Sequence, residues 1–118
     1  MTRNGAGGRI SVEGGTRTLY RIVGSDPPTE RDVWSHKRSG RRYHPSREHV
    51  ANGVSSFDRE QEARRTARRF PNTGTLIAEL HIPDWADVTV AQTMGRHYYA
   101  IWGDPKLLVT FVVRVAPV

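Results

Sequence analysis

The 118-residue sequence contains no cysteine and only two lysines. The lack of cysteine excludes a disulfide framework, a thiolate nucleophile and a cysteine zinc site. No apolar run approaches the roughly 20 residues that are needed to span a membrane, and the N-terminus lacks the apolar core of a signal peptide. We therefore expect a cytoplasmic protein with no membrane partner.

The basic residues are almost all arginine and are concentrated in the middle of the chain. Residues 31–69 hold eleven of the 18 Lys/Arg residues against five Asp/Glu, so this stretch carries a net charge of +6, equal to that of the whole chain. Arginine favours bidentate contacts with phosphate and carboxylate groups. A GC-rich genome, which encodes arginine over lysine, would produce the same composition. Composition alone leaves both explanations open.

The residue pattern predicts a single α+β domain over residues 16–118, after a flexible glycine-rich tail at 1–15. We expect a mostly antiparallel sheet of about five strands with two or three short helices. The strands are predicted near residues 16–23, 75–82, 88–90, 97–102 and 107–115, and the two clearest helices at 30–38 and 58–70. The last strand is the most apolar, which predicts a central position with Val109, Phe111 and Val113 in the core.

Two serines stand immediately before the second predicted helix. Asp58 is expected to cap this helix, and Gln61 three residues later would complete a capping box. Ser55 and Ser56 would then lie at the positive end of the helix dipole, where an anionic group is favoured. This turn is the best-defined polar site that the sequence predicts.

The order of these elements resembles that of the small ADP-ribosyltransferase-like fold, which includes NAD-degrading toxins with an arginine, a serine and an acidic motif residue. Leu19-Tyr20-Arg21 looks like the arginine strand of that family, and Gly53-Val54-Ser55-Ser56-Phe57 is similar to its serine turn. Leu80-His81-Ile82-Pro83 matches a strand that ends in an isoleucine-proline step. The chain departs from the family at the acidic element, because no Glu-x-Glu precedes the last strand.

The resemblance implies that NAD is the substrate. Arg21 would hold the pyrophosphate or the nicotinamide ribose, and the serines would position the ribose. Asp104, or else Glu79, would stabilise the oxocarbenium-like centre as nicotinamide leaves. Tyr98, Tyr99 or Trp102 would stack on the nicotinamide ring. The implied activity is that of an NAD-dependent transferase or glycohydrolase, such as a toxin, or of a catalytically inactive relative if no carboxylate reaches the site.

Each of these residues also has a structural interpretation. Arg21 shares a strand face with Leu19 and Val23, and a position on an edge strand would leave its charge exposed to solvent. The serines fit turn and cap positions, and Glu79 fits a solvated sheet face. Asp104 fits an N-cap that is followed by proline in the first helical turn. The five histidines show no spacing typical of a metal site.

A non-enzymatic alternative follows from the charge. A basic module that binds nucleic acid or another polyanion would use six of the arginines between residues 41 and 69, namely Arg41, Arg42, Arg64, Arg65, Arg68 and Arg69. A third possibility is a protein-interaction domain that binds a partner protein, as antitoxins and immunity proteins do. Of these, the NAD hypothesis makes the sharpest geometric prediction: Arg21 and Ser55 should face each other across a cleft. Side chains on opposite faces of the sheet would contradict a transferase.

Overall fold

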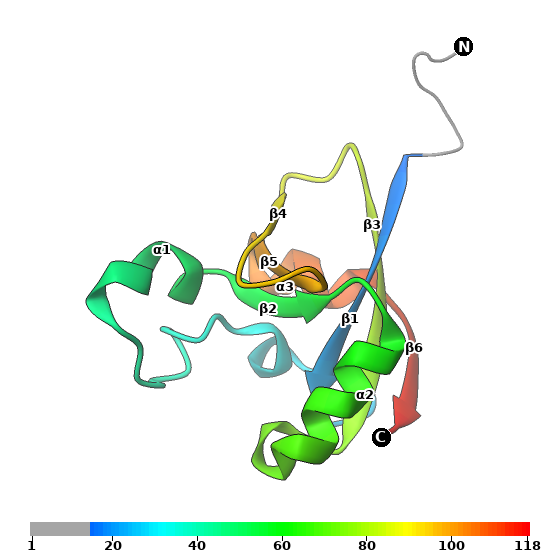
Figure 1. Ribbon diagram of the computed structural model, residues 1–118. Coiled ribbons are helices and arrows are strands. Elements are labelled where there is room, and N and C mark those ends of the chain that lie inside the picture. Colours follow the sequence, from blue (N-terminus) through cyan, green and yellow to red (C-terminus); the bar gives the residue numbers. More distant parts are fainter. Residues whose placement is uncertain (1–14) are drawn as a thin grey trace.

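The chain is organised around a six-stranded antiparallel sheet with the strand order β4-β5-β2-β1-β3-β6 (Figure 1). The computed structural model describes residues 15–118, so nearly all of the expected tail lies outside the described residues. The strands are β1 (Thr16–Val23), β2 (Val54–Phe57), β3 (Leu76–Pro83), β4 (Thr89–Gln92), β5 (Tyr98–Trp102) and β6 (Val112–Pro117). The α-helices are α1 (Glu48–Ala51), α2 (Glu60–Arg69) and α3 (Pro105–Leu108). The α+β class is confirmed, with one strand more than expected.

Both faces of the sheet are covered, so the described residues form two hydrophobic clusters. Leu19, Leu80 and Ile101 are fully buried on one face, together with Leu108 of α3 and Val33 from a 3-10 helix at Glu30–Val33. On the other face, the small residues Ala63 and Ala67 of α2 pack against Phe57 and Ile77. The alanines allow the helix to approach the sheet closely, which explains why a helix so rich in arginine still packs.

The alternation in β3 was predicted correctly. Ala78, Leu80 and Ile82 are buried on one face of the strand, and Glu79 and His81 lie on the other face, half-buried. Ile77 is also buried, because its face lies beneath α2 at that point. A period of two residues is therefore enough to locate this strand and its buried face.

The two strands at the centre of the sheet are paired very unequally. β1 pairs with β3 along its whole length, but it shares a single register position with β2, Tyr20 opposite Phe57. In Figure 1, β2 runs in a clearly different direction from β1. The sheet is thus opened between β1 and β2, and the residues that fill this opening determine the shape of the site described below.

The predicted central strand at residues 107–115 is wrong. Pro105–Leu108 forms α3, Val109–Phe111 forms a 3-10 helix, and only Val112–Pro117 is a strand, which lies at the edge of the sheet. Asp104 starts the helix because its Oδ1 accepts a hydrogen bond from Lys106 N at 2.9 Å. Phe111 is buried as expected, but Val109 is half-buried and Val113 is 56% exposed.

The predicted helix boundaries also need correction. α2 begins at Glu60 and has no side-chain cap, because the Asp58 carboxylate turns to the ring of His97 instead, with Oδ1 at 2.9 Å from Nδ1. The Asp58 amide donates to the His97 carbonyl at 3.2 Å, which extends the β2–β5 pairing and keeps Asp58 out of the helix. The helix predicted at residues 30–38 is a single 3-10 turn, Glu30–Val33, that ends where Trp34 becomes extended.

None of the helices in residues 15–118 is long and apolar enough to cross a membrane.

Truncation of Phe111 should destabilise the domain strongly. Phe111→Ala removes a ring that is 8% exposed within the larger cluster, and we expect a loss of roughly 3–5 kcal/mol in the free energy of unfolding. Val113→Ala, two residues away and largely exposed, should change it by less than about 0.5 kcal/mol. Chemical denaturation followed by circular dichroism measures both. Equal losses in the two variants would show that the packing described here is wrong.

Candidate functional site

Arg21 fills the opening between β1 and β2. It lies on an interior strand, so the sheet-edge interpretation is wrong. Its guanidinium donates hydrogen bonds to three backbone carbonyls: Nε to Asp32 at 2.6 Å, Nη1 to Ser55 at 2.7 Å and Nη2 to Trp34 at 3.4 Å. The arginine therefore ties the loop after β1 to the strand β2.

The Arg21 guanidinium has no carboxylate among these partners, and its pKa is lower than that of an ordinary arginine. Burial lowers the pKa of Arg21 to about 10, and the nearby positive charge of Arg41 lowers it further, while the charge of Asp32 opposes the shift. Arg21 stays protonated at neutral pH. Two guanidinium groups are thus held near each other at the opening of the sheet, an arrangement that favours an anion between or beside them.

The Asp32 carboxylate is occupied by its own loop. It accepts hydrogen bonds from Ser25 Oγ at 2.5 Å, from Thr29 N at 2.8 Å and from Gly24 N at 2.9 Å. Burial opposes ionisation of this group, but the hydrogen bonds outweigh it and hold the pKa of Asp32 below its usual value. This network fixes the loop whose carbonyls receive Arg21.

The two serines lie in β2 and not in a turn. Ser56 is completely buried, and its hydroxyl donates to the Tyr99 carbonyl at 3.4 Å, whereas Ser55 is exposed. Ser55 lies on the sheet face that carries Phe57, and Arg21 lies on the face that carries Leu19. The side chains of Arg21 and Ser55 thus start from opposite faces, contrary to the sequence-based prediction.

Arg21 and Ser55 nevertheless line the same cavity, which reaches the opening from the α2 side. This central cavity has a volume of about 430 Å³ and holds three kinds of group. Its aromatic residues are Phe57, Phe70, Tyr98 and Tyr99, its basic residues are Arg21, Arg41 and His36, and its hydroxyl residues are Ser55, Thr66, Thr73 and Thr93. No described residue that lines it is acidic.

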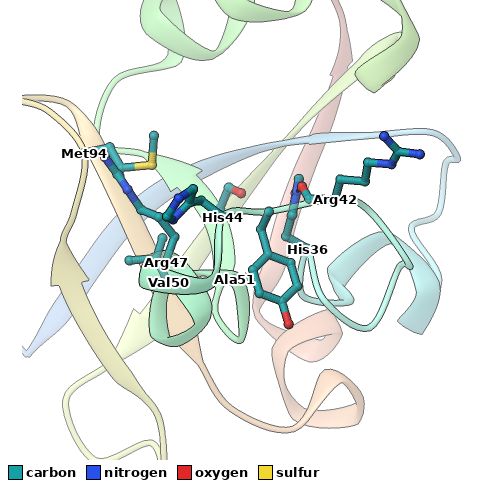
Figure 2. Close-up of a pocket in the computed structure, with 9 residues that line it drawn as sticks. His36, Arg42, His44, Arg47, Val50, Ala51 and Met94 are labelled. Atoms are coloured by element: carbon teal, nitrogen blue, oxygen red, sulfur yellow. Dashed lines mark hydrogen bonds between the residues drawn. The ribbon is translucent and has the colours of Figure 1, made fainter.

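Three neighbouring cavities share lining residues with the central cavity, and we refer to the four together as the cleft. A loop cavity of about 260 Å³ shares Ser55 and Met94 with the central cavity. In Figure 2, Met94 lies across from His44 and Val50, and the Arg42 side chain extends away from them. A second cavity of about 430 Å³, the polar cavity, includes Trp34. An open groove of about 640 Å³ lies at the end of α2.

Positive charge dominates the walls of this cleft. Six arginines line its four parts, and the one acidic residue found there in residues 15–118 is Asp32, which its own loop already satisfies. The arginines are Arg21, Arg31, Arg41, Arg42, Arg47 and Arg69. Arg41 lines three of the four parts, so it marks the point where they meet. The cleft is therefore suited to an anionic ligand.

The two carboxylates expected in the site lie elsewhere. Asp104 caps α3, as its structural interpretation predicted, and lines none of the four parts of the cleft. Glu79 receives hydrogen bonds from Arg114 at 3.1 Å and lies 2.6 Å from His81 Nε2. The hydrogen bonds from His81 and Arg114 lower the pKa of Glu79, which lies in the middle of β3 and forms ion pairs with both residues.

The six arginines predicted to bind a polyanion divide into two groups. On α2, Arg64 pairs with Glu60 at 2.6 Å and Arg65 pairs with Glu62 at 3.2 Å. Arg41, Arg42, Arg68 and Arg69 form no ion pair within residues 15–118. Only the second group retains charge that is available to a ligand.

Several residues of the cleft had no sequence signal. Phe70 follows Ala63 and Ala67 at helical spacing, which predicts a buried position, but it is 52% exposed. Met94, which lines the same cavity, is 63% exposed. His36 and Trp34 come from the loop after β1, whose path depends on the bonds to Arg21. The one sequence pattern that would have pointed to Phe70 is an aromatic residue directly after two arginines, Arg68 and Arg69.

The described residues contain no group of three or more His, Asp or Glu side chains that would hold a metal ion. Comparison with protein-family models, with curated proteins and with solved structures finds no match for this chain.

Removal of the Arg21 guanidinium should destabilise the domain. Arg21→Met leaves three carbonyls without their charged donor, and we expect a loss of at least about 3 kcal/mol in the free energy of unfolding. Arg17→Met, an exposed arginine on the same strand, provides the matched control and should cost less than about 0.5 kcal/mol. Denaturant unfolding measures the difference. If both variants unfold at the same denaturant concentration, Arg21 does not hold the opening together.

Asp32 should make stability depend on acid pH. Because its pKa is lowered in the folded state, its ionised form stabilises the fold above its unfolded pKa of about 3.9, and this contribution is lost as the pH falls through the folded value. Asp32→Asn should therefore be less stable than the wild type at neutral pH, and the difference should shrink as the pH falls below about 4. Unfolding curves at neutral and acid pH test this. A difference independent of pH would contradict it.

Proposed function

We propose that this chain binds NAD or a closely related phosphorylated nucleotide in the central cavity, without cleaving it. The observation that carries the proposal is the pair Arg21 and Arg41, two neighbouring guanidinium groups that share a cavity wall with aromatic side chains and with no carboxylate. Phosphate groups and a planar ring are the two parts of a nucleotide, and this cavity offers a partner for each.

The residues take different roles from those implied by the resemblance. Arg21 is committed to three carbonyls, so its charge acts on a ligand mainly through space, whereas Arg41 is exposed and forms no ion pair within residues 15–118. Arg41 would then bind the phosphates directly. Tyr98, 40% exposed and tilted against Phe57 at 5.1 Å, would stack on the ring of the ligand, and Ser55 would bind the ribose.

Binding without cleavage follows from the positions of the acids. Departure of nicotinamide develops positive charge on the ribose, which a nearby carboxylate would have to stabilise. Asp104 and Glu79 both lie outside the central cavity and have structural partners. The placement of Arg21 and Ser55 on opposite faces of the sheet also supports binding without cleavage. The proposal is thus a catalytically inactive relative of the ADP-ribosyltransferase-like proteins.

Calorimetry with NAD tests the proposal. The wild type should bind NAD, and Arg41→Gln should weaken binding by about tenfold or more, because a hydrogen bond to a charged group contributes about 1.5–3 kcal/mol. Arg65→Gln makes the same change of charge at an arginine that is paired with Glu62 outside the cavity, and it should leave NAD affinity unchanged.

Chromatography of the same mixtures should detect no release of free nicotinamide. Release that depends on the protein would refute the absence of catalysis, and wild-type protein that fails to bind NAD would refute the proposed function itself.

A further inference from the structure

The cleft does not end at the central cavity. The groove at the end of α2 is lined by Arg41, Arg69, Phe70, Pro71, Asn72 and Thr73, and it shares Arg41, Phe70 and Thr73 with the central cavity. A ligand seated in the central cavity can therefore continue into the groove. A single nucleotide would leave the groove empty, so its shape suits a longer ligand.

The groove is fixed in place by its backbone. Gly74, which follows it, has φ of 149°, and a Cβ at this position would lie 2.5 Å from the Val23 carbonyl oxygen. The Thr73 hydroxyl donates to the Phe70 carbonyl at 2.7 Å, which closes the turn. This short segment is thus held against the end of β1, and its side chains project from a defined frame.

On α2, the arginines without an ion pair lie in its last turn, and one of them, Arg69, lines the groove. Arg69 and Arg68 are exposed and form no ion pair within the described part of the chain, whereas Arg64 and Arg65 of the same helix are paired with acids. Basic residues in the last turn of a helix also interact favourably with its dipole, and this interaction is enough to explain the positions of Arg68 and Arg69. The dipole does not explain Arg41, which comes from a distant loop and lines the same groove.

An aromatic ring stands beside these charges. Phe70 is 52% exposed, and the guanidinium of Arg69 lies 5.3 Å from the centre of its ring. An exposed aromatic ring with arginines around it is the combination on which bases of single-stranded nucleic acids stack, while the arginines contact the phosphates. A paired base in a duplex has no free face for such a contact.

From these observations we propose that the natural ligand is a single-stranded nucleic acid whose terminal nucleotide occupies the central cavity. Arg41 contacts the terminal phosphate, Arg69 contacts the next phosphate, and the neighbouring base stacks on Phe70. This inference rests on the proposed function, because the central cavity must accept a nucleotide before the groove can accept the rest of the strand.

Fluorescence anisotropy with a labelled single-stranded DNA or RNA of about 12 nucleotides, within the usual range of site sizes, tests the inference. Wild-type protein should bind the single strand more tightly than a duplex of equal length, with an affinity that falls steeply as salt is raised. Arg69→Gln should weaken binding by about fivefold or more, and the matched control Arg65→Gln should not. Phe70→Ala should weaken binding of the single strand and leave binding of inorganic polyphosphate unchanged.

The outcomes separate the two proposals. Arg69 lines the groove but not the central cavity, so Arg69→Gln should bind NAD as the wild type does. Wild-type protein that binds NAD but no single strand would overturn this inference alone. Equal binding of duplex and single strand, or equal losses in Arg69→Gln and Arg65→Gln, would also overturn it. Failure to bind NAD would overturn the proposed function.

Discussion

The hydrogen bonds of the Arg21 guanidinium to three backbone carbonyls are the interaction on which the rest of the structure depends. A cation that is partly removed from water is costly unless its donors are satisfied. Arg21 is half-buried, and its partners are neutral carbonyls from the loop after β1 and from β2. The cation therefore keeps a net charge at the opening of the sheet. The same bonds fix the loop that carries Trp34 and His36 to the cleft.

This arrangement follows from the short β2 strand. The four residues of β2 all pair with β5, but only the last, Phe57, pairs with β1, so backbone groups earlier in β2 need other partners. Arg21 supplies one of them at the Ser55 carbonyl. An apolar residue at position 21 would continue the pattern of Leu19 and Val23 but would leave these carbonyls without donors. Arg21 thus satisfies these backbone carbonyls and also contributes positive charge to the cleft.

Local patterns in the sequence predicted the fold class, β1 and β3, because a period of two residues reports the sheet face directly. They failed at residues 107–115, where apolar alternation competes with a capped turn: Asp104 and Pro105 start a helix that a periodicity argument does not include. They failed at Asp58 because its partner, His97, lies 39 residues away in sequence. The site depends on such distant contacts throughout. Its residues could therefore be proposed one by one from the sequence, but their arrangement in space could not.

The arginine excess, ambiguous in the sequence, divides according to the partners of each side chain. A genome that prefers arginine codons would enrich arginine at every basic position, whatever its surroundings. It would not place Arg64 and Arg65 against acids while leaving Arg41 and Arg69, from different elements, in one groove beside an exposed Phe70. A preference for arginine codons would account only for arginine in place of lysine. The convergence of these residues on one cleft is what the anionic ligand proposed above would explain.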